Sequence, residues 1–166
     1  TEALFNYLNY GTAIISYIGH GSPTQLAQEK LLELSRGDLN QIQTGTKLPL
    51  WIVGTCSFGH FDDPLTESFS EELIRSKMNA ASAVISTSRP ITVIGNELYT
   101  SELFESIFSQ NKPSDKGIGI LLQSIKDGTS ESQYFHLFGD PAMKIPIPKD
   151  TLLISNINPD TLKTLQ

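Results

Sequence analysis

Cysteine is nearly missing from this sequence, which has only Cys56 among its 166 residues. A single cysteine excludes an internal disulfide framework and a zinc site built from several cysteines. Runs of basic residues are missing too, and together with a net charge of -6 this argues against nucleic acid as a partner. The longest apolar stretches, 12–18 and 48–54, are far shorter than the roughly 20 residues of a membrane-spanning helix.

The remaining composition is that of a globular protein. Hydrophobic residues make up 39% and charged residues 18%, a balance that argues against a disordered or fibrous chain, and 166 residues suffice for one domain with its own core. Serine and threonine together outnumber the charged residues, which suits a protein outside the cytoplasm. The chain starts at Thr1 without a secretory signal pattern, and residues 156–160 are typical of a linker, so we expect a piece of a longer protein.

Apolar runs alternate with segments of helical spacing along the chain. The runs at 12–18, 48–55, 83–87 and 134–138 predict strands. Helices are predicted over 3–10, 35–42, 66–79, 97–110 and 117–126, with Ser35 and Thr66 as N-caps of the second and third and Asp127-Gly128 as the stop of the last. This alternation predicts an α/β fold, in which a mostly parallel sheet has helices on both faces.

Two of the predicted strands lead directly into reactive side chains, the first into His20 and the second into Cys56. Ligands of an open parallel sheet bind beyond the carboxyl ends of its strands, so these two side chains share one edge if the strands are neighbours. A nucleophilic thiol needs a nearby base or cation, which His20 can supply, and the Gly21 and Cys56 amides can stabilise an oxyanion. Taken singly, Cys56 also fits a small buried apolar residue, and His20 a loop histidine bonded to the backbone.

An ordered set of motifs covers most of residues 12–148. They read YIGHGS at 17–22, GTCSFGHFDDP at 54–64, SFSEELI at 68–74, AASAVISTSRP at 80–90 and HLFGDPAMKIPIP at 136–148. This set resembles the gingipain-type cysteine peptidases of clan CD, which share a caspase-like fold with a His-Gly after one strand and a small residue followed by Cys after the next. The last two motifs are most similar to PorU-type members, the surface sortases of the type IX secretion system in Bacteroidota.

The resemblance implies a role for each matching residue. Cys56 would be the nucleophile that forms a thioester, His20 its acid and base, and the Gly21 and Cys56 amides the oxyanion hole. The primary specificity pocket would be flanked by Ser86, Thr87, Ser88 and Arg89. Arg89 has two possible roles. It could bind a substrate carboxylate, or it could be a solvated charge or part of a salt bridge.

The resemblance also implies a setting for the domain. Residues 1–150 would be the C-terminal catalytic subdomain, with a caspase-like fold, and 151–166 a linker or the start of a following domain. The acidic residue that orients His20 would lie in an N-terminal subdomain outside this chain. The substrate would be a polypeptide, in a PorU-type protein the C-terminal sorting domains of secreted proteins. The acyl group would pass to water or to an amine on lipopolysaccharide, at the surface of a Gram-negative bacterium and alongside other type IX secretion components.

Two other interpretations stay open. The chain could be a catalytically silent caspase-like scaffold of a cell-surface protein. It could be a metal-binding module, although no common ligand spacing is present and we expect no cofactor. The ligands of such a metal site would be His20, Cys56, His60 and either Asp62 or Asp63.

Further candidates lie near the main motifs. His60 is a second possible base, and His136, inside an apolar strand, is more typical of a core or edge histidine. The segments Asp62-Asp63-Pro64 and Gly139-Asp140-Pro141 are typical of turns, with calcium binding as the alternative.

Overall fold

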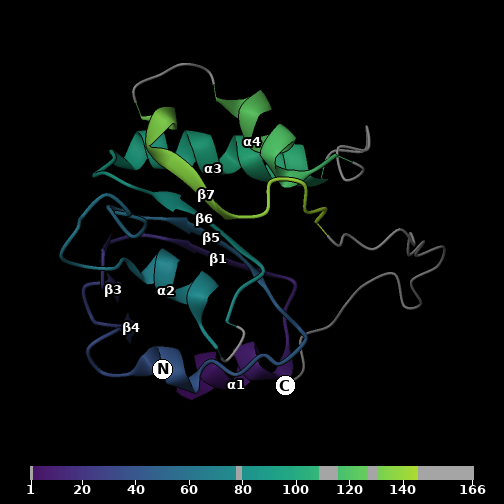
Figure 1. Ribbon diagram of the computed structural model, residues 1–166. Coiled ribbons are helices and arrows are strands. Elements are labelled where there is room, and N and C mark those ends of the chain that lie inside the picture. Colours follow the sequence, from purple (N-terminus) through teal and green to yellow (C-terminus); the bar gives the residue numbers. More distant parts are fainter. Residues whose placement is uncertain (1, 78–79, 109–115, 127–130, 146–166) are drawn as a thin grey trace, which may run out of the picture.

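A four-stranded sheet forms the centre of the computed structural model, which describes residues 2–77, 80–108, 116–126 and 131–145 (Figure 1). Its strand order is β1-β5-β6-β7. The strands are β1 (Ile14–Ile18), β5 (Leu50–Gly54), β6 (Ala83–Thr87) and β7 (Phe135–Gly139). The first three are parallel and β7 is antiparallel to β6, so the sheet is mostly parallel and the predicted α/β class is confirmed.

Alternation along the strands divides the core into two layers. Trp51 and Val53 point to one face, whereas Leu50 and Ile52 point to the other, because successive side chains of a strand lie on opposite sides. The second face is covered by α3 (Val93–Phe108) and α4 (Ile118–Ile125). The first is covered by α1 (Glu2–Tyr10) and α2 (Phe69–Arg75) (Figure 1). Helices therefore lie on both faces, as the sequence predicts.

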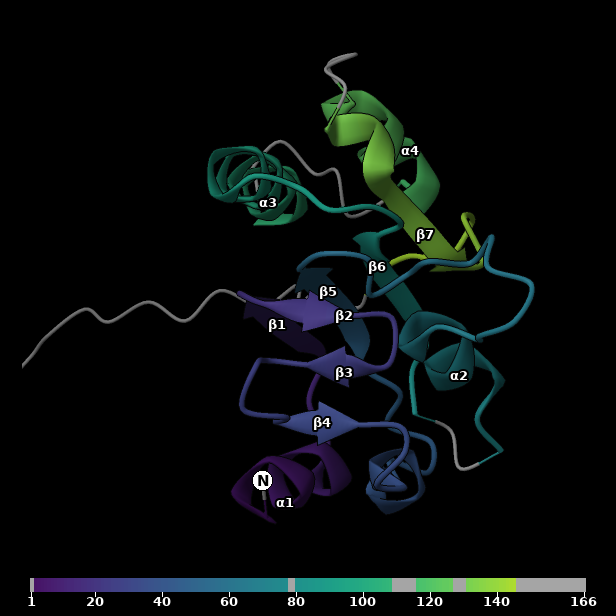
Figure 2. The same ribbon diagram turned by 90° about the vertical axis from the view of Figure 1, so that its left-hand side faces the viewer.

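A second, three-stranded sheet follows β1 and was not predicted. Its antiparallel strands are β2 (Gly21–Ser22), β3 (Gln25–Leu26) and β4 (Leu32–Glu33). Figure 2 shows them stacked from the end of β1 toward α1. Leu26 and Leu32 are buried in the same core layer as Trp51, so this small sheet is part of the fold. Strands of two residues are too short to show alternation, which is why the sequence pattern does not reveal them.

The short helix expected over 35–42 is instead the 3-10 turn η1 (Asp38–Gln41). Its N-cap is Gly37, at φ 79, and the predicted cap Ser35 was wrong. The reason is Asp38, whose carboxylate accepts hydrogen bonds from the Glu33 amide at 2.8 Å and from Arg36 Nε at 2.9 Å. These bonds fold the chain back before residue 38 and leave no cap position at residue 35.

Helix α2 starts three residues later than expected, and its cap is Ser68, not Thr66. Ser68 and Glu71 form a capping box, in which the Ser68 amide donates to Glu71 Oε2 at 2.8 Å and Ser68 Oγ accepts from the Glu71 amide. Helix α3 starts four residues before the predicted 97. The predicted ends at 109–110, the stop at Asp127-Gly128 and the linker at 151–166 lie outside the described residues.

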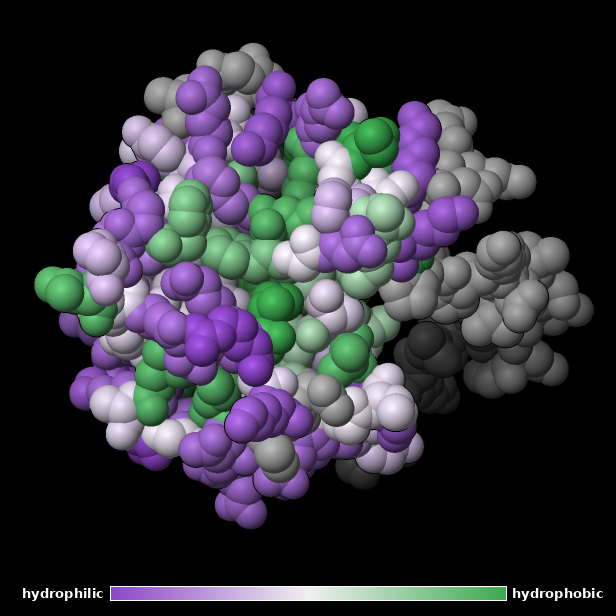
Figure 3. All heavy atoms as spheres, in the orientation of Figure 1, coloured by the Kyte–Doolittle hydropathy of each residue, from purple (hydrophilic) through white to green (hydrophobic). Residues whose placement is uncertain are grey.

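One face of the molecule exposes the edge strand β7 between α4 and α2. In the space-filling view of this face, hydrophobic side chains gather at the centre and polar ones surround them (Figure 3). A short 3-10 turn, η3 (Ser132–Tyr134), leads into β7. Within the described part of the chain, no helix has the length and apolar character needed to cross a bilayer.

Candidate active site

Strands β1 and β5 place His20 and Cys56 at the same edge of the sheet. They pair in parallel, and the last pair of the register is Ile18 with Gly54. Beyond it, the Gly19 amide donates to the Gly54 carbonyl at 3.1 Å. His20 and Cys56 each follow this last pair by two residues, so the adjacency that the sequence analysis assumed is confirmed.

The backbone after His20 packs directly on the residue before Cys56. A Cβ atom added to Gly21 would lie 2.3 Å from Thr55 Oγ1, a distance that no real side chain tolerates. Glycine is therefore required at position 21, because any larger residue would push the β2-β3 hairpin away from the Cys56 turn. The His-Gly motif thus has a steric reason in this fold.

Cys56 lies in a tight turn that is hydrogen-bonded to the end of β6. Thr87 Oγ1 donates to the Thr55 carbonyl and accepts from the Ser57 amide at 3.2 Å, which spans Cys56 on both sides. The Ser57 amide also donates to the Arg89 carbonyl at 3.3 Å. These contacts keep Ser57 in the left-handed region at φ 57, a conformation that is strained for a residue with a side chain. Cys56, between Thr55 and Ser57, is half-buried in this turn.

Asn96 on α3 is hydrogen-bonded to the end of β5, and the sequence analysis did not predict this contact. Its Nδ2 donates to the Gly54 carbonyl at 2.7 Å, and its Oδ1 accepts from Thr100 Oγ1 at 3.3 Å. A Cβ atom on Gly54 would lie 2.1 Å from Asn96 Oδ1, so the glycine makes this contact possible. Asn96 lies one residue before the predicted helix start at 97, so the sequence pattern carried no signal for this role, and its burial in α3 is seen only in the structure.

The two reactive side chains are not bonded to each other in this structure. His20 is exposed, and its ring forms no hydrogen bond or ion pair with any described residue. Its carbonyl accepts from Tyr17 Oη at 3.0 Å and from the Ala27 amide at 2.9 Å, so its backbone is fixed. The Cys56 thiol faces the Ile91 carbonyl at 3.9 Å. Catalytic hydrogen bonds commonly tighten only when substrate is bound.

The predicted oxyanion donors are both available. The bond from the Ala27 amide to the His20 carbonyl makes Gly21 and Leu26 a non-hydrogen-bonded pair of the antiparallel hairpin. The Gly21 amide therefore points away from β3. In the part of the chain that the structure describes, the Cys56 amide forms no hydrogen bond. Both amides can thus donate to a developing oxyanion.

The residues expected to flank the specificity pocket continue from β6. Ser86, Thr87 and Ser88 are buried, and each hydroxyl bonds to a neighbouring part of the fold. Ser86 Oγ lies 2.7 Å from Ser70 Oγ on α2, and Ser88 Oγ lies 3.0 Å from Nε2 of His136 on β7. Of the three, Thr87 contacts the residues on either side of Cys56 through its hydroxyl, and a contact of these residues with substrate stays a prediction.

Arg89 is paired with the loop that follows Cys56. Its Nη1 donates to Asp62 Oδ1 at 2.9 Å, so in this structure it forms the salt bridge that was one of its two predicted roles. The guanidinium lowers the pKa of Asp62 to about 2, and His60 lies 3.4 Å from the same carboxylate. His60 is thereby tied to Asp62, and a substrate contact of Arg89 stays a prediction.

The other candidates have structural partners. His136 packs edge-on against the ring of Phe61 at 5.1 Å between centroids, as expected of an edge-strand histidine. Asp63 Oδ1 accepts from the Leu65 amide and Asp140 Oδ1 from the Ala142 amide, which are turn contacts. Among residues 2–77, 80–108, 116–126 and 131–145, no three His, Cys, Asp or Glu side chains cluster closely enough to hold a metal ion.

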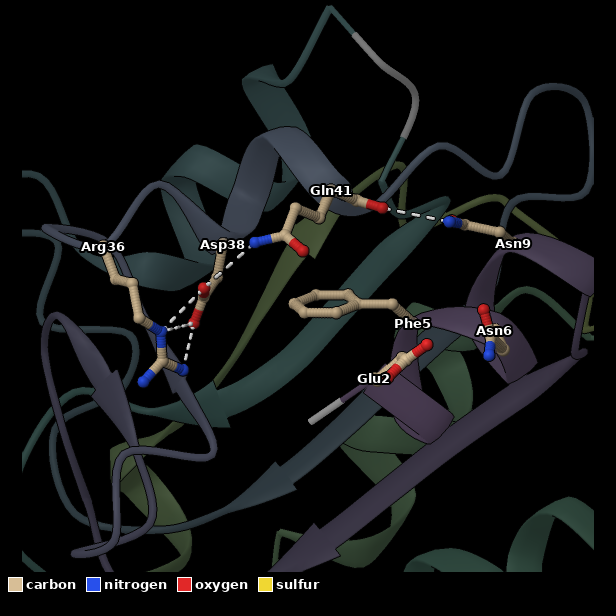
Figure 4. A pocket seen from close by; sticks show the side chains of 7 residues that line it. All are labelled: Glu2, Phe5, Asn6, Asn9, Arg36, Asp38 and Gln41. Carbon is tan, nitrogen blue, oxygen red and sulfur yellow. Dashed lines mark hydrogen bonds and ion pairs between the residues drawn. The ribbon is translucent and has the colours of Figure 1, made fainter.

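A polar pocket of 540 Å³ lies apart from Cys56, between α1 and η1 (Figure 4). Asp38 in its wall is buried. Burial alone would raise the pKa of Asp38, but hydrogen bonds from Arg36 and the Glu33 amide outweigh it and lower the pKa. The charge of Asp38 is fully paired, so this pocket has the features of a structural cluster. Its lining comprises Glu2, Phe5, Asn6, Asn9, Arg36, Asp38 and Gln41.

An α/β domain that presents a His-Gly and a Thr-Cys at the ends of adjacent parallel strands has the arrangement of a cysteine-type peptidase. Residues 1–146 match peptidase family C25, and the chain belongs to this family. Comparison with curated proteins found no match.

Solved structures of gingipains have the same fold. The crystal structure of the Arg-specific cysteine proteinase gingipain R (RgpB) aligns with a TM-score of 0.72 at 18% identity, over 87% of this chain and 36% of that chain. The complex of the Porphyromonas gingivalis RgpB pro- and mature domains aligns with a TM-score of 0.70 at 18% identity, over 87% and 36%. A structure described only as a protease aligns at 0.72 and 19%, over 85% and 37%. This chain therefore spans well under half the length of these relatives.

Proposed function

We propose that the chain is the catalytic subdomain of a cysteine peptidase, with Cys56 as nucleophile and His20 as acid and base. The observation that carries this proposal is the register of β1 and β5, which puts both residues two positions beyond the last pair, Ile18 and Gly54. Membership of peptidase family C25 supports the same class of chemistry.

In the proposed mechanism the Cys56 thiolate attacks the carbonyl carbon of the scissile peptide bond. The carbonyl oxygen becomes an oxyanion, which accepts hydrogen bonds from the Gly21 and Cys56 amides. When the C–N bond breaks, protonated His20 donates its proton to the leaving amine, and a thioester remains on Cys56. Water or an amine then attacks the thioester carbon, His20 takes the proton of this nucleophile, and the C–S bond breaks.

The finer proposal concerns the biological reaction. The motifs at 80–90 and 136–148 resemble PorU-type sortases, so we propose that the substrates are C-terminal sorting domains of type IX secreted proteins and that the acceptor is an amine on lipopolysaccharide. Under this proposal the protein acts at the cell surface of a Gram-negative bacterium. Hydrolysis and transfer use the same two residues, and the choice of acceptor decides between them.

The test is the rate of Cys56 alkylation by iodoacetamide as a function of pH, in this chain and in the longer protein. A free thiol becomes reactive near pH of about 8.5, whereas a thiolate paired with histidine reacts well below about 7. We expect reactivity at low pH that His20→Ala removes and that the control His60→Ala keeps. This control is needed because His60 follows Cys56 closely in the sequence and is the second candidate base.

Two results would contradict the proposal. If the longer protein shows only the reactivity of a free thiol, with and without His20, the domain is a silent scaffold. If His60→Ala removes the low-pH reactivity and His20→Ala does not, the base has been misassigned. Cys56→Ala in the longer protein should also abolish processing of its substrate while the domain remains folded.

A further inference from the structure

A small pocket of 220 Å³ opens on the hairpin side of His20. All of its wall residues lie between 20 and 28, in the β2-β3 hairpin and the turn after it. None of them comes from the loops that follow β5 or β6, so the pocket borders His20 without including the Cys56 turn. The wall consists of His20, Gly21, Ser22, Gln25, Ala27 and Gln28.

The pocket is fixed to the backbone of His20. The Ala27 amide donates to the His20 carbonyl at 2.9 Å, and Ala27 adopts a left-handed conformation at φ 65 that turns the chain back toward the hairpin. Gln25 Nε2 donates to the Ala27 carbonyl at 2.8 Å, which closes the turn from the other side. The pocket wall and His20 therefore form one hydrogen-bonded unit.

The pocket presents polar, uncharged groups. The Nε2 of Gln25 is used within the turn, which leaves its carbonyl oxygen as an acceptor. Gln28 is exposed, and its amide has no hydrogen-bond partner among the described residues. Together with the Ser22 hydroxyl, these groups can donate and accept hydrogen bonds, and apart from His20 the wall contains no ionisable side chain.

The chemistry of His20 determines which part of a substrate lies beside it. In the proposed function, His20 gives its proton to the amine that leaves, so the residue bearing that amine must be next to the imidazole ring. From this we infer that the pocket is the subsite for the residue that follows the scissile bond, and that it selects a polar, uncharged side chain. This inference rests on the proposed roles of His20 and Cys56.

The same pocket would select the acceptor in a transfer reaction. An incoming amine attacks the thioester carbon along the path by which the leaving amine departed, and its proton passes to His20 as the C–S bond breaks. Its side chain therefore occupies the same subsite. A polar pocket at this place favours transfer to polar amines over apolar ones of similar size.

The experiment measures how a Cys56 thioester divides between water and added amines. The longer protein is first mixed with N-acetyl amino-acid thiobenzyl esters, and the ester that gives a covalent adduct at Cys56 by mass spectrometry is chosen. The ratio of amide product to acid product is then measured with asparaginamide and leucinamide as acceptors. We expect asparaginamide to be favoured at least fivefold, roughly the effect of one hydrogen bond.

Gln28→Leu should reduce this preference about fivefold, because it removes one hydrogen-bonding group from the wall. The matched control is Gln123→Leu, which changes an exposed glutamine of α4 on the opposite face of the sheet and should keep the preference. Ser22→Ala provides a second variant of the wall. Preservation of the fold is checked in each variant by circular dichroism.

The outcomes separate the two proposals. If no ester forms an adduct at Cys56, the proposed function fails, and the subsite fails with it. If the adduct forms but both acceptors react equally, the pocket does not select the acceptor and the inference is wrong. Equal preferences in Gln28→Leu, Ser22→Ala and Gln123→Leu would also overturn it.

Discussion

Thr55 and Gly21 are in such close contact that a single methyl group on the glycine would lie 2.3 Å from the threonine hydroxyl. The two residues are neighbours of the candidate nucleophile and the candidate base in sequence, so this contact couples the positions of Cys56 and His20. The contact joins the three-stranded sheet to the four-stranded sheet next to the two candidate catalytic residues.

Gly21→Ala should therefore separate the hairpin from the Cys56 turn. We expect the low-pH alkylation of Cys56 to fall at least tenfold, because His20 moves with the hairpin. The double variant Gly21→Ala with Thr55→Gly removes the clashing atoms and should recover part of the rate. Failure of the second change to restore any reactivity would mean that Gly21 acts in another way than by its contact with Thr55.

Thr87 is expected to hold the turn through its hydroxyl, which bonds on both sides of Cys56. Thr87→Val keeps the shape of the side chain but removes its hydroxyl. The Thr55 carbonyl then loses this donor, and the Ser57 amide keeps only its hydrogen bond to the Arg89 carbonyl. The variant should lose about 1–3 kcal/mol in free energy of unfolding, measured by urea denaturation. Thr87→Ser keeps the hydroxyl and serves as the control. A Val variant as stable as the Ser variant would contradict the assigned bonds.

Asn96 is predicted to position the strand end from the opposite face. Asn96→Ala removes the donor to the Gly54 carbonyl and opens space in a buried site. We expect a loss of about 1–3 kcal/mol in unfolding free energy and slower alkylation of Cys56. The control is Asn40→Ala on the exposed surface of η1, which should change neither quantity. Slower alkylation is the readout that distinguishes a positioning residue from a merely stabilising one.

The stability of the domain should fall in mild acid because of His136. Burial, followed by the charges of Lys126 and Arg89, lowers the pKa of this histidine below its ordinary value of 6.5. As pH falls through 6.5, the unfolded chain takes up the proton before the folded one, so folding loses free energy until the lower folded pKa is reached. Above pH 6.5 the histidine has no such effect.

His136→Gln should therefore flatten the decline of stability between pH 7 and 5, measured as urea midpoints at several pH values. Glutamine does not titrate in this range, and its side-chain amide can still form a hydrogen bond with Ser88 Oγ. The exposed histidine variant His20→Gln is the matched control. Parallel pH profiles for the wild-type protein and His136→Gln would show that His136 does not cause the decline.

Calcium should leave the stability of the domain unchanged. The carboxylate of Asp62 is held by Arg89, and those of Asp63 and Asp140 bond to amides in their own turns. We expect the same melting temperature in excess calcium chloride and in EDTA. A melting temperature that rises clearly with calcium would revive the metal-binding interpretation, and metal analysis of the purified protein would then identify the ion.

The sequence predicts the main sheet well because its strands are mostly apolar runs of five residues, long enough to be recognised, and β5 and β6 are buried throughout. The sites at their ends follow from the same pattern, since parallel strands bring their carboxyl ends to one edge. Thr66 failed as a cap because Ser68 and Glu71, two residues further on, form the better capping box. The brace from Asn96 to Gly54 could not be foreseen, because it joins segments 42 residues apart and depends on how α3 packs.

The parallel pairing of β1 with β5 has a consequence for when Cys56 and His20 come together during folding. Such a pair needs a long crossover, and here that crossover contains the whole small sheet and η1. Contacts between distant segments form late, because the intervening chain must first close into a loop. A newly made chain therefore brings Cys56 and His20 to one edge of the sheet only after the crossover between β1 and β5 has closed.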